Sequence, residues 1–351
     1  MTQLDLLLPF AMPPGEMARD LLRELKMPSL ATLLARASRS THEIFDGFAR
    51  ALPHEYWLAR QFDIAPVRDS DNSPALAAST MRSFHLPAET GTWFILQPVH
   101  LHITRDHLVL TDTRQLQLAE SDARALFHIV QPLFEEVGKS LVYGDAQTWF
   151  MRADDWHALQ TSTPDAACGH NIDIWMPKGS HERDWRRLQN EIQMHWHAHA
   201  VNEEREARGL KPVNSVWLWG GAEVQKRSDT NAKFEEAFIF SNERKPFTAL
   251  ANQKIAITSA ADMLATRPER GLLAIDDLIE AALAGDWAEW LQRFQAMEEL
   301  WFAPLLTALQ DGRLDRLAIT ISHNTAYSTF DISKSSLHKF WRKPSLARLA
   351  S

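Results

Sequence analysis

The chain has 351 residues, 45% hydrophobic and 23% charged, which is ordinary for a globular protein of two domains or of one domain with an insertion. A net charge of −8 argues against a general nucleic-acid-binding protein, and a single cysteine excludes a disulfide framework. Because the N-terminus lacks a basic signal region and no apolar run reaches the ~18 residues of a membrane span, we expect a cytoplasmic protein that binds no membrane.

The N-terminal region predicts a strand followed by helices. Leu4–Leu8 is a short apolar run typical of a buried strand. Residues 15–37 then show helical spacing, which Pro28 interrupts. A polar, loop-rich stretch follows around Asp69–Pro74.

The next region changes character and predicts strands. Residues 92–103 and 107–112 are expected to pair around Arg105 and Asp106, because apolar residues alternate with histidines in the first run. A helix capped by Ser121 should follow, and then a hairpin that turns at Gly144 and Asp145.

This β-β-α-β-β order predicts a compact α+β domain. We place it as an insertion at residues 85–155, within a core formed by residues 1–84 and 156–351. Strands interleaved with helices make the core α/β, with a mostly parallel central sheet flanked by helices.

The C-terminal half carries the clearest helix signal. Asp286 and Glu289 form a capping box, and Gly312 supplies a stop. Residues 316–322 then read as an apolar strand. The basic segment "HKFWRKPSLAR", residues 338–348, reads as a solvated face. The 13 tryptophans indicate packing in the core or, alternatively, an aromatic groove for a ligand.

The segment "HWHAHAVNEEREARGLKPVNSVWLWGG" is the most suggestive stretch of the sequence. Its histidines 195, 197 and 199 could hold zinc, but on a helix only His195 and His199 share a face, so polar surface positions are the alternative. Asn202 suits a helix N-cap and Gly209 a C-cap. The following strand is expected to end at a glycine pair, where backbone can approach a ligand.

A second polar cluster follows the last apolar strand. Ser322, His323 and Asn324 lie there, and His338 comes soon after. These side chains could bind metal, act as a base or bind an anion, but the same residue types are also ordinary in turns.

The order of these motifs resembles the archaeal-type, cofactor-independent phosphoglycerate mutases of the alkaline-phosphatase-like superfamily. Their pattern HPVN..R...G..PAN...LRG.G is matched, within a residue of spacing, by His199, Val201, Asn202, Arg205, Gly209, Pro212, Asn214 and Gly220. The segments "MPSLATLLARA" and "ITISHNTAYS" resemble further elements of that family, so the similarity spans most of the chain.

The resemblance implies two metal ions held by Asp and His side chains, and this sequence departs from that pattern. Where the family has a metal-binding Asp and His, this chain has Ile279 and Leu283. The Asp of the last motif is Ser322, although His323 remains, and an Arg is replaced by Trp219. Replacing several ligands with aliphatic side chains removes the charge that holds two dications.

These departures predict a catalytically degenerate protein with no metal and no cofactor. The Trp-rich composition and "VNSVWLWGG" are similar to the bacterial RpfE-type regulatory proteins, which implies a regulatory role. We expect the former cleft to bind a small anionic or phosphorylated ligand or a protein partner, and no nucleic acid. The candidate ligand-binding residues are His199, Asn202, Arg205, Asn214, Trp219, Gly220, Gly221, His323, Asn324 and His338.

Several alternatives stay open, one of which is a purely structural interaction protein with no small-molecule site. Arg205 could clamp a phosphate or carboxylate with its planar guanidinium, or Asn202 and Arg205 could only fix loop geometry. The chain could also be an active metal-dependent phosphomutase or phosphohydrolase that recruits ligands such as Asp276, Asp277 or His100.

Overall fold

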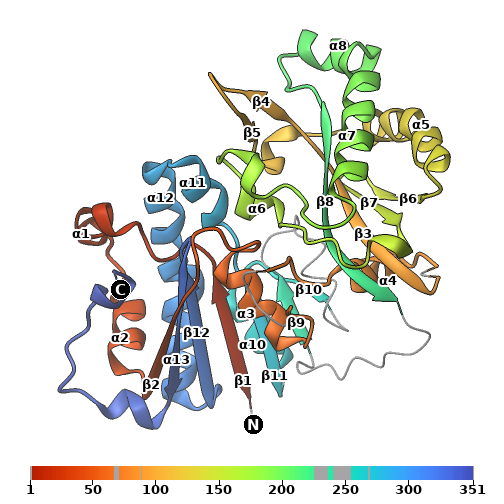
Figure 1. The fold of residues 1–351 in the computed structure, drawn as a ribbon. Helices are drawn as coiled ribbons and strands as arrows, with labels where there is room; N and C mark the ends of the chain where they lie inside the picture. The colour runs from red at the N-terminus through yellow and green to blue at the C-terminus, as the bar shows by residue number, and fades with distance from the viewer. Residues whose placement is uncertain are drawn as a thin grey trace. The chain divides into compact units, whose positions relative to one another are not determined.

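The computed structural model describes residues 2–66, 71–87, 89–224, 236–239, 254–267 and 269–350. The chain divides into two compact units, one formed by Met1–Gly47 with Asn231–Ser351 and the other by Phe48–Thr230. Each unit has its own sheet (Figure 1). The expected insertion, residues 85–155, lies inside the second unit.

The first unit is built on a seven-stranded sheet. Its order is β10 (Lys254–Ala256), β9 (Glu236–Ile239), β11 (Arg270–Ala274), β1 (Gln3–Leu8), β12 (Arg316–Ser322), β13 (Ala326–Ser333) and β2 (Arg39–Ile44). Neighbours from β10 to β12 are parallel, whereas β13 is antiparallel to both of its neighbours, β12 and β2. The sheet is therefore mixed, with four parallel and two antiparallel strand pairs among the described residues. Residues 323–325 alone join β12 to β13, and a connection that short allows only an antiparallel return.

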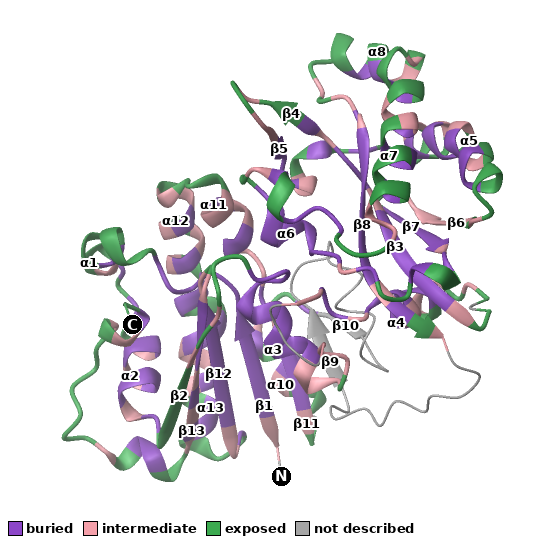
Figure 2. Ribbon diagram, in the orientation of Figure 1, coloured by how far each residue is buried: buried purple, intermediate pink, exposed green. Residues whose placement is uncertain are grey.

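The helices of the first unit follow the sequence signals closely. They are α1 (Gly15–Glu24), α2 (Pro28–Arg36), α10 (Ala260–Thr266), α11 (Leu278–Ala284), α12 (Trp287–Met297), a π-helical turn (Glu298–Phe302), α13 (Ala303–Asp311) and two 3₁₀ turns (Ser335–His338 and Ala347–Leu349). Pro28 starts α2, as its fixed φ favours. Asp286 caps α12 by accepting from Glu289 N, and Gly312 ends α13 with φ +76°. Figure 2 shows that β1 and β12 are largely buried.

The second unit contains a four-stranded antiparallel sheet. Its order is β6 (Ser140–Asp145), β7 (Thr148–Arg152), β3 (Gly91–Val99) and β8 (Ser215–Val224), and a separate hairpin joins β4 (Leu101–Ile103) to β5 (Leu108–Leu110). The expected turn at Arg105 and Asp106 is confirmed for this hairpin. The β6–β7 turn lies two residues later than expected, because Asp145 pairs with Thr148.

Helices and short turns complete the second unit. They are α3 (Pro53–Gln61), α4 (Ala77–Ser83), α5 (Glu120–Glu136), α6 (Pro164–Ala167), α7 (Glu182–His197) and α8 (Ala200–Ala207), with 3₁₀ turns at Thr113–Leu116, Asp154–Trp156 and Ile172–Ile174. Ala119 stands at the N-cap of α5, so the expected cap Ser121 lies inside the first turn. Four tryptophans are fully buried in this unit, namely Trp149, Trp185, Trp196 and Trp217, which favours the core role over an aromatic groove. No helix in the described parts of the chain has the length and apolarity to cross a membrane.

Candidate functional site

The carboxyl edge of the first unit's sheet is where an open α/β fold binds its ligands. Strand β1 leads there into Phe10–Met12, β11 into Asp276 and Asp277, and β12 into Ser322. This edge is therefore the first place to look for the chemistry that the sequence resemblance implies.

The ends of β1 and β12 are joined by direct hydrogen bonds. Phe10 N donates to Ser322 Oγ at 3.3 Å, and Met12 N donates to Ser322 O at 3.1 Å. Trp290 Nε1 donates to Phe10 O at 2.9 Å. Phe10, Met12, Ser322 and Trp290 are all buried, and Phe10 has a left-handed φ of 57°. The chain after β1 is thus fixed by main-chain contacts among apolar side chains.

His323 and Asn324 occupy the turn between β12 and β13. His323 Nδ1 accepts from Thr325 N at 3.2 Å, and His323 N donates to Ala326 O at 2.9 Å. Burial, and then the neighbouring His42, lower the pKa of His323, which keeps the imidazole neutral. Asn324 is exposed. These contacts favour ordinary turn chemistry for the stretch.

The two aspartates after β11 form a like-charge pair. Burial and the neighbouring Asp276 raise the pKa of Asp277 to about 6, and the nearby Arg293 opposes this shift. Arg293 NH1 also donates to Asp277 O at 3.0 Å. Asp277 therefore loses its proton at a pH about two units higher than an ordinary aspartate does, a property that suits proton transfer near neutral pH.

The residues of this edge do not fit a centre of two metal ions. Ile279, which stands where the resemblance places a ligand, is buried in α11 at 1% exposure. Within the ranges that the structure describes, no group of three or more His, Cys, Asp or Glu side chains is arranged to hold a metal. Of the alternative ligands, Asp276 and Asp277 belong to the first unit and His100 to the second.

The remaining predicted residues divide between the units. His338 is exposed at the end of a 3₁₀ turn in the first unit, and the others lie in the second. His199, not Asn202, is the N-cap of α8, and its Nδ1 accepts from Val201 N at 3.2 Å. Asn214 bonds both main-chain groups of Leu101 at 2.7 Å.

Asn202 and Arg205 have their polar groups engaged within the second unit. Asn202 bonds Val213 N and O and the carbonyl of Trp196. The Arg205 side chain is 0% exposed; it donates to the carbonyls of Lys211, Gln117 and Leu116 and pairs with Asp122 at 3.3 Å. These contacts favour the alternative in which both residues fix loop geometry.

The glycine pair lies inside β8 rather than at its end, which corrects the expected strand boundary. The strand continues to Val224, and β8 itself is bulged at the glycines, where Gly220 and Gly221 together stand opposite Phe94 of the antiparallel partner β3. A Cβ on Gly221 would lie 2.6 Å from Phe94 Cε1. Gly220 has φ +69°, and its N–H donates to Ser73 Oγ at 3.0 Å. The two glycines thus allow close packing of two strands, and Trp219 beside them is buried at 3% exposure.

A buried cluster of acidic and basic side chains in the second unit was missed by the sequence reasoning. Glu55 is 2% exposed and accepts from Leu52 N at 2.7 Å and from Thr163 Oγ1 at 2.6 Å. Arg114 binds Asp112 at 2.7 Å and Asp165 at 3.2 Å. These residues come from the segments that begin α3, the 3₁₀ turn Thr113–Leu116 and α6, where carboxylates suit helix N-termini.

Burial perturbs the titration of this cluster. Burial, and then the negative charge of Asp165, raise the pKa of Glu55 to about 8, so Glu55 is protonated at neutral pH. Burial and the adjacent Arg114 lower the pKa of His54 to about 3. Clusters of this kind occur at functional sites and in structural ion-pair networks alike. The available sequence signal was Pro53 with Glu55, a helix start with an acidic N3 residue.

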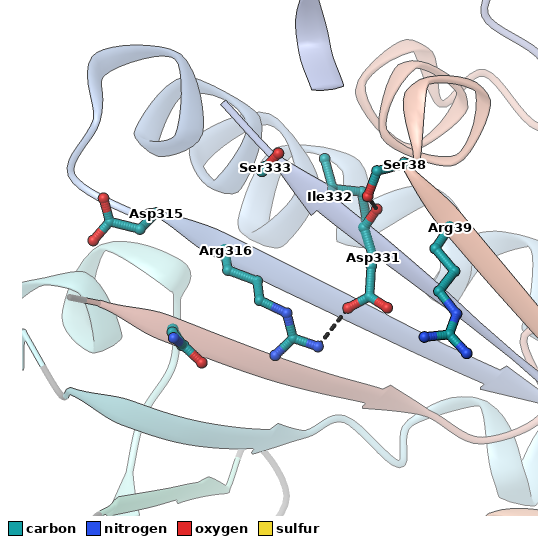
Figure 3. A pocket seen from close by; sticks show the side chains of 8 residues that line it. Ser38, Arg39, Asp315, Arg316, Asp331, Ile332 and Ser333 are labelled. Carbon is teal, nitrogen blue, oxygen red and sulfur yellow. Dashed lines mark hydrogen bonds and ion pairs between the residues drawn. The ribbon is translucent and has the colours of Figure 1, made fainter. Parts of the chain in front are cut away.

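A surface cavity of about 440 Å³ lies in the first unit (Figure 3). It is lined by Gln3, Ser38, Arg39, Asp315, Arg316, Asp331, Ile332 and Ser333. Arg316 pairs with Asp331, and Asp315 accepts from Thr2 N at 2.8 Å. Two arginines and two aspartates balance in charge, so the lining does not select an anion.

The comparisons with known proteins support a fold but not a family. No family model and no curated protein matches the chain. The PH0037 protein from Pyrococcus horikoshii is 10% identical, with 99% of this chain and 92% of that chain covered and a TM-score of 0.57. The two proteins therefore share a fold over nearly their whole lengths.

A cofactor-independent phosphoglycerate mutase from Thermoplasma acidophilum is also similar. It is 13% identical, with 100% of this chain and 94% of that chain covered, at a TM-score of 0.44.

Proposed function

We propose that this chain is a regulatory binding protein that has the mutase-like architecture of its sequence resemblance but no two-metal phosphotransfer chemistry. The observation that carries the proposal is the closure of the sheet edge by Phe10, Met12 and Ser322. The proposed partners are a small anionic or phosphorylated ligand or a protein, and the proposed location is the cytoplasm.

The physical argument concerns charge. Two-metal catalysts hold their cations about 3.5–4 Å apart with several carboxylates and imidazoles, which stabilise both reacting oxygens. At the ends of β1 and β12 this chain offers main-chain hydrogen bonds, a neutral serine and buried apolar side chains. One neutral His323 and the Asp276–Asp277 pair supply too few donors for that task.

The proposed ligand must use side chains that the fold leaves accessible. The polar groups of Arg205 and Asn202 are engaged within the protein, which leaves them unavailable for the anion contact. Asn324 and His338 are exposed, and His199 and His323 are half-buried. His323 and Asn324 are neighbours in the β12–β13 turn, whereas His338 follows β13 and His199 belongs to the second unit. A ligand that accepts hydrogen bonds from imidazole and amide groups fits the pair His323 and Asn324.

Calorimetry with Mn²⁺ and Zn²⁺, together with a phosphatase assay on sugar phosphates, tests the loss of metal chemistry. We expect no tight stoichiometric binding and the same negligible turnover in the wild type and in His323→Ala. Stoichiometric metal binding with turnover that His323→Ala or Asp277→Asn abolishes would instead establish the metal-dependent enzyme.

Thermal shift with sugar phosphates tests ligand binding separately. A ligand that binds only the folded state raises the melting temperature. We expect a rise that the His323→Ala or Asn324→Ala variant reduces, with exposed Met194→Ala as the matched control. No shift with any sugar phosphate would leave the protein partner as the only form of the proposal.

A further inference from the structure

The C-terminal segment after β13 contains a turn with two aromatic side chains at its tip. Arg342 N donates to Lys339 O at 3.0 Å, the hydrogen bond that closes a β-turn around Phe340 and Trp341. Central turn positions usually carry Gly, Pro, Asn or Asp. Here Phe340 is 77% exposed and Trp341 is 69% exposed. Their rings pack edge to face, with 5.4 Å between the ring centroids.

The base of this turn is fixed to the C-terminus of α2 by side-chain hydrogen bonds. Lys339 Nζ donates to Ala37 O at 3.3 Å, and Arg342 NH1 donates to the carbonyls of Ala35 and Ala37 at 3.3 and 3.2 Å. Cations suit these positions because the last carbonyls of a helix carry partial negative charge. The aromatic tip, Phe340 with Trp341, is therefore held in place and turned toward solvent before any partner arrives.

The charge around the aromatic tip is opposite to that of the whole protein. Residues 332–351 contain five Lys or Arg and no Asp or Glu, whereas the chain as a whole carries −8. Lys343 is exposed and takes no part in the contacts that hold the turn. Charge complementarity thus calls for an anionic occupant.

We propose that the aromatic tip docks peripherally on an anionic phospholipid surface, in place of the sequence-based expectation that the protein binds no membrane. Trp side chains favour the headgroup level of a bilayer, and flanking cations are attracted to anionic lipids. A lipid surface accepts a projecting tip without shape matching, whereas a stable protein interface needs about 800 Å² on each partner. Single-stranded nucleic acid would need ring faces for stacking, but these two rings are inclined at 79°.

Vesicle co-sedimentation tests this proposal, which does not depend on the proposed function. We expect the wild type to pellet with vesicles rich in phosphatidylglycerol, not with pure phosphatidylcholine, and to be released by high salt. Trp341→Ala and Phe340→Ala should each weaken binding roughly tenfold. The charge reversal Lys343→Glu should weaken it roughly thirtyfold.

Matched controls separate docking from folding. Met194→Ala and Ile103→Ala remove exposed apolar side chains elsewhere, at 70% and 82% exposure, and should bind vesicles like the wild type. All variants should keep the wild-type melting temperature, because the altered side chains are solvated. The proposal fails if the wild type ignores anionic vesicles, if Trp341→Ala binds undiminished, or if the tip variants lose affinity for single-stranded RNA instead.

Discussion

Replacing Arg205 by alanine distinguishes a structural residue from an anion clamp. Its side chain is 0% exposed and donates to the carbonyls of Lys211, Gln117 and Leu116. One of these residues, Gln117, has a left-handed backbone conformation with φ 47°. The substitution leaves these carbonyls and Asp122 without their buried donor. Removing one partner of a buried, hydrogen-bonded charge typically costs about 3–5 kcal/mol, so we expect a loss of unfolding free energy of that size.

Arg208 supplies the matched control, because it pairs with the same Asp122 at 3.1 Å but is 51% exposed. Arg208→Ala should cost no more than about 1 kcal/mol, the value typical of surface ion pairs. Arg205→Lys should fall between the two, since one ammonium cannot span all the carbonyls. Urea unfolding at neutral pH, analysed with a common m-value, measures the difference in free energy of unfolding between each variant and the wild type.

The contrary result is well defined. If the free energy of unfolding of Arg205→Ala lies within about 1 kcal/mol of the wild-type value, the buried contacts of Arg205 contribute little to stability, and the structural role is refuted. Loss of a sugar-phosphate thermal shift in that same stable variant would then restore Arg205 as the anion clamp.

Two further predictions concern stability. Gly221→Ala places a Cβ 2.6 Å from Phe94 Cε1, so urea unfolding should show a free energy of unfolding lower by about 1–3 kcal/mol. Phe94→Leu should restore part of that loss, whereas unchanged stability of Gly221→Ala would contradict the close packing. The pKa of Glu55 is about 8 in the folded protein and 4.5 in the unfolded chain. Its contribution to the free energy of unfolding is therefore complete below pH 4.5 and is lost as the pH rises from 4.5 through 8, by up to about 1.4 kcal/mol for each pH unit. Glu55→Gln should flatten that part of a stability–pH profile, and an unaltered profile would show that Glu55 titrates normally.

Much of the fold could be predicted from local sequence. Leu4–Leu8, the capped helix at Asp286 and the stop at Gly312 were all confirmed, because hydrophobic periodicity and cap chemistry act within a few residues. The predicted end of β8 was wrong, because a glycine pair can mark either the end of a strand or a place where a neighbouring strand packs closely.

The candidate site was harder to predict, since it depends on contacts between distant segments. Glu55, Arg114 and Asp165 are far apart in the chain, and no short pattern shows that they share one buried cluster. Arg205 resembled a motif residue of a ligand-binding enzyme family, yet its partners Leu116, Gln117 and Asp122 lie at the end of a 3₁₀ turn and in α5. A motif gives the residue type, whereas burial and partners decide what the side chain can reach.

The sequence by itself determined most of the helices and strands and the α/β class of the core, and it placed the aliphatic Ile279 and Leu283 where the resemblance implies metal ligands. Tertiary structure alone decided that the sheet is mixed, that the guanidinium of Arg205 is enclosed and that Phe340 and Trp341 project from a basic turn. The reason is physical: propensity and capping are local, but burial, charge pairing and exposure depend on which distant segments the fold brings together.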